Sequence, residues 1–308
     1  MFDTHCHLNF KAFKRNVNDV VVRAEKEGVE FIVVPGTDVK TSKKGVEIVQ
    51  NLDGVYAAVG IHPHHVMKYL TRHAELDSAS SMSFPRKRES RKLWIPDQVG
   101  DDSGEILHFV RDDVYEIEKL LSHPKVVAVG EVGLDNHTYE NTVYQDYQID
   151  SRFLELQKEL FKNQIDLAVK YKKSLILHNR EAKKDFLQIL REKWAKHLEY
   201  RTVFHCCEPD EELLNFAKEN HIFIGVDGDV TYSKEKQRFI KNVPLEMLVI
   251  ETDSPFLLPE PLRTEKKYPN KPENIVIIAE KVASILNLST VKIGQKTTEN
   301  AKELFGLE

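Results

Sequence analysis

Eight short apolar runs, rich in valine and isoleucine, recur along the whole chain. Each is bounded by turn-forming residues, which is the pattern of strands buried on both faces. The runs are Met1–Cys6, Glu30–Gly36, Val55–Ile61, Val126–Val132, Ser174–His178, Thr202–His205, Ile222–Val226 and Leu248–Asp253. Since strands covered on both faces are typical of parallel sheets, we expect a parallel sheet whose strands are joined by crossover segments.

Helical patterns occupy most of the intervals between these runs. They cover Val17–Glu27, Thr41–Gln50, Val114–Leu121, Phe153–Tyr171, Lys184–Glu192, Glu211–Asn220, Lys234–Asn242 and Asn274–Leu286. Eight alternating units predict an α/β fold of the (β/α)8 TIM-barrel type. A doubly wound open sheet is the alternative, but no GxGxxG turn follows the first strand. The 308 residues suit one barrel domain over residues 1–308, although they would also hold two smaller domains.

The segment 73–105 interrupts this regular series after the third strand. Serine, proline and charged residues dominate it, and no period survives. We expect a low-complexity, disordered insertion, because long surface loops cost little stability. The basic run Pro85–Lys92 would alternatively bring positive charge toward a nucleic acid, but acidic residues further along the segment offset it.

Composition favours a protein of a reducing compartment. The three cysteines, Cys6, Cys206 and Cys207, form no CxxC pair and no even disulfide framework. No apolar run approaches a membrane-spanning length, and the N-terminus lacks the pattern of a signal peptide. We therefore expect a cytoplasmic protein without a membrane partner, as a monomer or weak oligomer. The net charge of −5 gives no global basic signature of a nucleic-acid binder, although metal ions can make a cleft locally positive.

Histidines and carboxylates gather at the ends of the predicted strands. His5 and His7 are two residues apart on a strand, so both side chains project from the same face. Others follow at later strand ends: His62, His64 and His65, Glu131 and Asp135, His178, His205, and Glu251 and Asp253. Because the carboxyl ends of barrel strands converge on one rim, the pattern predicts a shared metal site rather than isolated surface histidines.

Seven motifs carry a family resemblance that spans the chain. They are DTHCHL (Asp3–Leu8), GIHPH (Gly60–His64), VGEVGLD (Val129–Asp135), LILHNREA (Leu175–Ala182), VFHC (Val203–Cys206), ETDSPFLLP (Glu251–Pro259) and TTENAKELF (Thr297–Phe305). With them the chain resembles the TatD family of metal-dependent deoxyribonucleases, among the amidohydrolase-like barrels. The resemblance implies a (β/α)8 fold, two divalent metal cations, phosphodiester hydrolysis of the exonuclease kind and a nucleic acid substrate, DNA above all.

The resemblance also implies a role for each matching residue. One metal would be held by His5, His7, Glu131 and Asp253, and a second by Glu131, His178 and His205. The substrate phosphate would face His62, His64 and Arg180. Glu131 suits the bridging role because a carboxylate has two oxygens, and Asp253 is the candidate general base. The metal stays open between Mg, Mn and Zn, since imidazole suits zinc while carboxylates suit magnesium or manganese.

Two departures from the family pattern keep other functions open. After His205 the family usually has the sequence Cys-Phe-Ser-Gly, but this chain reads HCCEPDEE (His205–Glu212). The acidic residues of this segment would lie at the rim and weaken binding of a polyanion. The segment Pro259–Asn274 lacks the family's usual Arg-Asn-Glu-Pro motif but retains several lysines. A related hydrolase of an aminoacyl-tRNA ester or a small phosphoester or amide is therefore the alternative. A non-enzymatic metal-binding protein is less favoured, because structural sites are usually closed and four-coordinate.

Several polar residues have structural interpretations. We expect Asp135 to cap the following helix, and Asp227 and Asp229 to shape a loop around Gly228. Asn300 is expected in a terminal helix that packs against the barrel.

Overall fold

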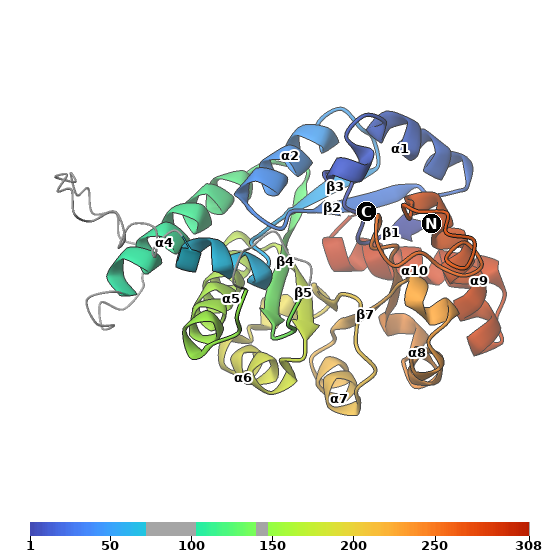
Figure 1. Ribbon diagram of the computed structural model, residues 1–308. Coiled ribbons are helices and arrows are strands. Elements are labelled where there is room, and N and C mark those ends of the chain that lie inside the picture. The colour runs from blue at the N-terminus through green and yellow to red at the C-terminus, as the bar shows by residue number, and fades with distance from the viewer. Residues whose placement is uncertain (72–102, 140–146, 308) are drawn as a thin grey trace.

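Eight parallel strands form a single sheet in the order β1 to β8. The computed structural model describes residues 1–71, 103–139 and 147–307 (Figure 1). The strands are β1 Phe2–Asp3, β2 Phe31–Pro35, β3 Val55–Val59, β4 Val126–Asp135, β5 Ser174–Arg180, β6 Thr202–Phe204, β7 Phe223–Val226 and β8 Leu248–Ile250. A parallel bridge between Cys6 and Ser254 joins the segments after β1 and β8, which nearly closes the barrel. The predicted (β/α)8 barrel is confirmed.

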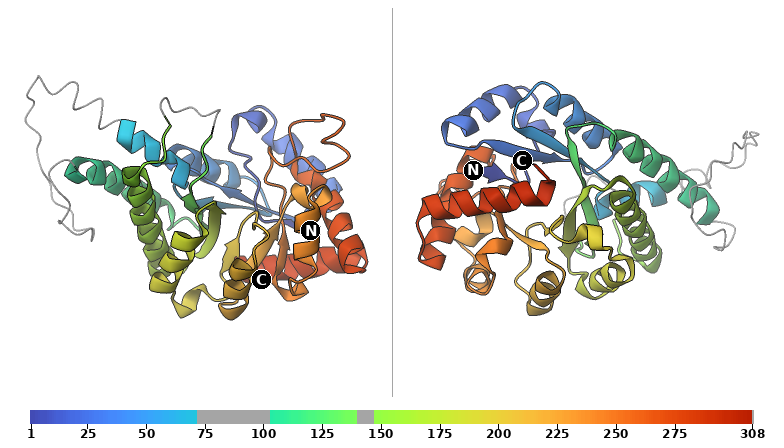
Figure 2. Two further views of the ribbon diagram at one scale, coloured as in Figure 1. Left: turned by 60° about the horizontal axis from the view of Figure 1, so that its bottom comes forward. Right: turned by 180° about the vertical axis from the view of Figure 1, so that it is seen from behind.

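Helices surround the strands on the outside (Figure 2). They are α1 Val17–Lys26, α2 Val39–Val49, α4 Ser103–Leu120, α5 Ser151–Tyr171, α6 Lys183–Lys193, α7 Glu211–Glu219, α8 Lys234–Ile240, α9 Ile275–Leu286 and α10 Thr290–Phe305. In the described ranges, no single helix is long and apolar enough to span a membrane. The bent helix pair Pro272–Leu286 and Thr290–Phe305 meets the length and composition criteria only when its two helices are taken together.

Several predicted boundaries differ from the structure. Helix α4 begins at Ser103, well before the predicted Val114, because the buried face of Val114 and Ile117 continues upstream to Val110. The predicted insertion 73–105 therefore ends within this helix, and its residues up to 102 lie outside the described ranges. Strand β1 ends at Asp3 rather than Cys6, because its ladder with β2 stops there.

The barrel interior is filled by a compact apolar cluster. Alternate strand positions supply it: Phe2, Val33, Ala58, Ala128, Ile176, Val203, Phe223 and Val249. Helix α10 closes the end of the barrel where the strands begin, since Leu304 and Phe305 join this cluster. Asn300 of α10 is buried and donates to Leu245 O at 2.8 Å and Leu248 O at 2.7 Å, so its predicted packing role is confirmed. The opposite rim, at the carboxyl ends of the strands, carries the polar residues.

Candidate metal centre

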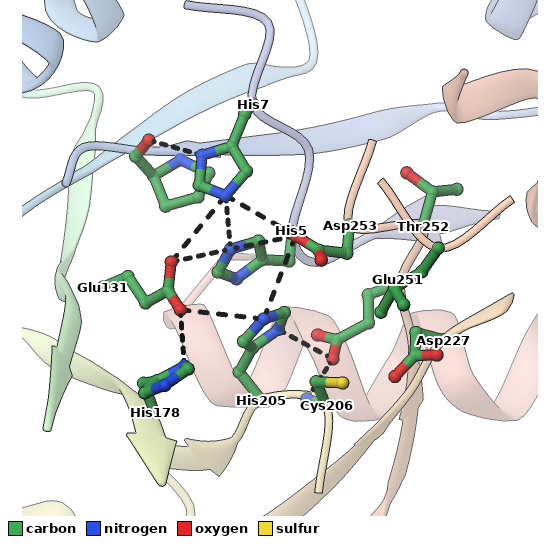
Figure 3. Close-up of polar contacts among 12 residues, drawn as sticks. His5, His7, Glu131, His178, His205, Cys206, Asp227, Glu251, Thr252 and Asp253 are labelled. Carbon is green, nitrogen blue, oxygen red and sulfur yellow. Dashed lines mark hydrogen bonds and ion pairs between the residues drawn. The ribbon is translucent and has the colours of Figure 1, made fainter. Parts of the chain in front are cut away.

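The predicted ligands converge at the carboxyl-end rim of the barrel (Figure 3). His5 and His7 follow β1, and their Nε2 atoms lie 3.2 Å apart. Cys6, between them, points to the opposite side and is buried in the apolar core. The alternation expected for a strand thus holds at His5 and His7, although β1 itself ends earlier.

Four donor atoms form one compact set around His5. His5 Nε2 lies 3.4 Å from Glu131 Oε2 and 3.9 Å from Asp253 Oδ1. His7 Nε2 lies 3.7 Å and 3.5 Å from the same two oxygens. Ligands about 2.1 Å from a tetrahedral cation stand about 3.4 Å from one another. The spacing of these four donors therefore fits a single divalent cation.

A second set of donors surrounds the other oxygen of Glu131. Glu131 Oε1 lies 3.0 Å from His178 Nδ1, 3.6 Å from His62 Nε2 and 3.8 Å from His205 Nε2. One oxygen of this buried carboxylate thus faces His5 and His7, and the other faces His178 and His62. His205 contacts both groups, since its ring also stacks on His5 with centroids 3.5 Å apart. This arrangement suits a carboxylate that bridges two cations.

Burial and charge favour the metal-binding forms of Glu131 and His5. Burial raises the pKa of Glu131, but His62, His178 and His5 outweigh it and hold that pKa well below its usual range. Burial lowers the pKa of His5, and the charge of His205 lowers it further. An ionised carboxylate and a neutral imidazole are the forms that coordinate metals. Nδ1 of His5 is buried and has no hydrogen-bond partner among the described residues, so no neighbour fixes its tautomer.

Buried residues behind the donors fix their orientation. Glu251 is fully buried, and its Oε1 lies 2.9 Å from His205 Nδ1 while accepting the Cys206 amide at 2.6 Å. Thr4 Oγ1 donates to the other carboxylate oxygen of Glu251 at 3.1 Å. A carboxylate behind a ligating histidine fixes the imidazole and raises its basicity. Glu251 was recognised from sequence only as a strand-end residue, and its position two residues before Asp253 was the available signal.

The family follows from comparison with known proteins. A family model described as TatD related DNase matches residues 2–306. The chain belongs to the TatD family. A relative from Bacillus subtilis, described as the uncharacterized metal-dependent hydrolase YabD, is 31% identical over 307 residues, which cover 99% of this chain and 98% of that protein. Family membership makes this chain a metal-dependent hydrolase of the TatD type.

Solved structures share the barrel of this TatD-family chain. YjjV, a TatD homologue from Escherichia coli, has a TM-score of 0.74 and 23% identity, covering 100% of this chain and 98% of its own. The Escherichia coli phosphotriesterase homology protein, solved with phosphate in its active site, has a TM-score of 0.59 and 11% identity, covering 99% and 98%. At these identities the likeness supports the fold alone.

Asp135 of this TatD-family chain does not cap a helix, so that prediction is wrong. The cap of α5 is Asp150, which accepts the Phe153 amide at 2.8 Å. Strand β4 runs three residues beyond its predicted end, which keeps Asp135 at the rim. There Asp135 Oδ2 lies 3.0 Å from His178 Nε2 and accepts Tyr139 OH at 2.6 Å. Tyr139 lies in a segment without periodicity, so no sequence signal pointed to it.

The three residues predicted to face substrate lie beside the second set of donors. His62 reaches Glu131, and its ring packs on His178 with centroids 4.4 Å apart. Arg180 Nη1 donates to Tyr139 OH at 3.2 Å, and the ring of His64 stands edge-on to Tyr139 at 5.1 Å. His62 thus belongs with the donors by distance, whereas His64 and Arg180 flank them.

A further group, Cys206, Asp227 and Asp229, also has metal-ligand spacing. The buried ammonium of Lys236 lies 3.3 Å from Asp229 Oδ2 and 3.6 Å from Asp227 Oδ2. A lysine thus supplies the positive charge that a metal would otherwise bring. Asp227 Oδ1 accepts the Asp229 amide at 2.8 Å, which confirms the predicted loop around Gly228.

Proposed function

We propose that this protein is a deoxyribonuclease that uses two divalent cations to hydrolyse phosphodiester bonds, starting from the ends of DNA strands. The observation that carries the proposal is the division of donors by Glu131, whose two oxygens face His5 and His7 on one side and His178 and His205 on the other. Membership of a family whose model is described as TatD related DNase supports DNA as the substrate.

Two overlapping sets of residues would hold the two cations. His5, His7, Glu131 and Asp253 would hold one cation, and Glu131 with His178 and His205 the other. Bound there, the cations would acidify water and neutralise charge on the phosphate oxygens. Mg, Mn and Zn all remain candidates for this mixed set of imidazoles and carboxylates.

Asp253 is the candidate general base for the attacking water. Its side chain is 14% exposed, whereas that of Glu131 is 6% exposed, so Asp253 is the more open of the two carboxylates. One oxygen of Asp253 faces the donors, and a carboxylate at an open rim can accept a proton from water. Arg180, held beside Tyr139, is placed to donate its planar N–H groups to a phosphate.

A nuclease assay tests the proposal. Single-stranded DNA labelled at the 3′ or the 5′ end is incubated with the wild type or Glu131→Ala, with magnesium, manganese, zinc or a chelator. We expect a ladder that requires metal and that Glu131→Ala abolishes, and the label lost first gives the polarity. No cleavage by a folded, metal-loaded wild type would contradict DNA as the substrate.

An aminoacyl ester is the second candidate substrate, and one observation favours it. Glu208 is half-buried near the rim, and its Oε2 accepts Asn179 Nδ2 at 3.2 Å. Asp210, in contrast, caps α7 and pairs with Lys183 at 2.7 Å. A carboxylate at Glu208 suits the ammonium group of an aminoacyl ester better than a phosphate. Glu208→Gln should then lower the rate of ester hydrolysis while leaving or raising DNA cleavage.

A further inference from the structure

Two phenylalanines stand at the rim against the metal ligand His7. Phe10 stacks on the His7 ring with centroids 4.3 Å apart and planes at 15°. Phe256 stands edge-on to Phe10 at 6.0 Å and to His7 at 6.1 Å. Phe256 is 50% exposed, although a ring of this size is normally buried. An exposed aromatic face therefore lies directly beside the metal donors.

Backbone hydrogen bonds fix this aromatic pair relative to the donors. The Phe256 amide donates to Asp253 O at 2.8 Å, and the His7 amide donates to Ser254 O at 2.7 Å. Asn270, fully buried further along the same loop, donates to Thr252 O at 2.9 Å. The loop after β8 is thus tied to the strand end that carries Asp253, and Figure 2 shows it beside the segment that follows β1.

Positive charge continues from Phe10 away from the donors. Residues 4–18 contain Lys11, Lys14 and Arg15 and no acidic residue, and all three cations are exposed. The carbonyl of Asn9 accepts Lys44 Nζ from helix α2, so this segment lies against that helix.

Helix α2 adds further lysines beside this segment. Burial lowers the pKa of Lys44, and the charges of Lys14 and Lys40 lower it further, while the charge of Glu47 raises it. Lys40 and Lys44 also line a groove of about 580 Å³ at the start of α2, together with Lys43 and Lys68 and with three carboxylates, Asp38, Glu47 and Asp113. Aromatic faces followed by a cationic track are the features that bind a single nucleic acid strand.

We propose that Phe10 and Phe256 form a stacking site for the unpaired terminal base of a DNA strand, with the lysines beyond Phe10 holding the following phosphates. The inference rests on the proposed nuclease function and adds the subsite that seats the terminal nucleotide. A base stacked there places its phosphate beside the donors, because the Phe10 ring contacts His7 and the Phe256 amide donates a hydrogen bond to the backbone carbonyl of Asp253. Stacking is tolerant of sequence, since every base has an aromatic face.

A fluorescent base tests the stacking without requiring catalysis. An oligonucleotide carries 2-aminopurine at the end attacked by the wild type, and binding is followed in calcium by fluorescence quenching. We expect quenching by the wild type and by Phe256→Trp, and at least about a fivefold loss of quenching with Phe256→Ala. Tyr200→Ala is the matched control, since Tyr200 is 44% exposed and precedes β6 at the other end of the barrel.

A substrate change supplies the second readout. The wild type is expected to cleave an oligonucleotide with an intact terminal base about tenfold faster, in kcat/KM, than one with an abasic end. Phe256→Ala should reduce this ratio to about one, while Tyr200→Ala should keep it.

The two proposals fail in different ways. If the wild type binds and cleaves DNA but Phe256→Ala keeps both the quenching and the intact-to-abasic ratio, the stacking site is overturned and the nuclease stands. If the wild type neither binds nor cleaves any oligonucleotide, the nuclease function is overturned and the stacking site falls with it.

Discussion

At the scale of single residues, protonation decides how the centre takes up metal. Burial lowers the pKa of His178, but hydrogen bonds to Asp135 and Glu131 outweigh it and raise the pKa to about 9. Burial likewise lowers the pKa of His205, and Glu251 outweighs it and raises the pKa to about 10. Both imidazoles of the metal-free protein are therefore protonated at neutral pH.

Metal binding should consequently release about two protons at pH 7, because each of His178 and His205 must lose one before it can coordinate. Isothermal titration calorimetry in buffers of different ionisation enthalpy measures this number. Affinity should rise with pH toward 9 and 10. The raised pKa values also stabilise the metal-free fold fully below the ordinary histidine pKa of 6.5, and this contribution is lost as pH rises through 9 to 10. Release of no protons at pH 7 would contradict the assignment.

Glu251 is a positioning residue whose removal should weaken metal binding. Glu251→Gln keeps the shape but loses the charge behind His205, so metal affinity should fall about 10- to 100-fold. Competition with a coloured chelator measures the affinity. Glu246→Gln is the matched control, because Glu246 is exposed and lies shortly before β8 in the chain. This variant should bind metal with unchanged affinity. Equal affinities of the two variants would remove Glu251 from the account.

The role of Glu251 could not be predicted from the sequence, although His205 and Asp253 could. The end of a strand predicts that a residue lies at the rim, but the partner of Glu251 follows β6, and the two meet only once β6 and β8 lie on either side of β7. His62 is a similar case. The resemblance implied contact with substrate, and only the fold shows that its ring reaches Glu131.

At the scale of elements, the close contact of β4 with β5 sets the position of His178. Gly133 has a φ of +148°, and a Cβ there would lie 1.8 Å from His178 O. Only glycine allows the two strands to approach this closely while both carry donors.

Gly133→Ala should therefore destabilise the fold by about 3 kcal/mol, from backbone strain and the displacement of β5. Urea unfolding measures the loss. Gly28→Ala is the matched control, because Gly28 also has a positive φ, +85°, but no atom within 4 Å of the added Cβ. That control should lose only about 1 kcal/mol. Equal losses of unfolding free energy in the two variants would show that the close contact with His178 does not contribute to stability.

The order and type of the elements could be predicted because apolar runs and helical periods are local patterns. Their ends could not. β1 stops at Asp3 and β4 continues to Asp135, since a strand ends where its neighbour's hydrogen bonds end. The mistaken capping role of Asp135 follows from that one boundary.

At the scale of the whole molecule, every candidate donor lies in the described ranges and outside the predicted insertion. Deletion of Asp77–Gly104 should therefore leave metal-dependent activity largely intact. Activity is compared with the full chain after circular dichroism has shown that the deletion variant folds. A folded variant without activity would instead make the segment part of substrate binding.

If Glu131 joins two cation sites, the number of metal ions bound per chain depends on this one side chain. Wild type and Glu131→Ala are dialysed against each metal in turn, and bound metal per chain is measured by mass spectrometry alongside protein concentration. We predict about two cations per wild-type chain and at most one in Glu131→Ala, because the variant loses a donor from both sets. One cation or fewer in the wild type with every metal, or two in the variant, would contradict the account.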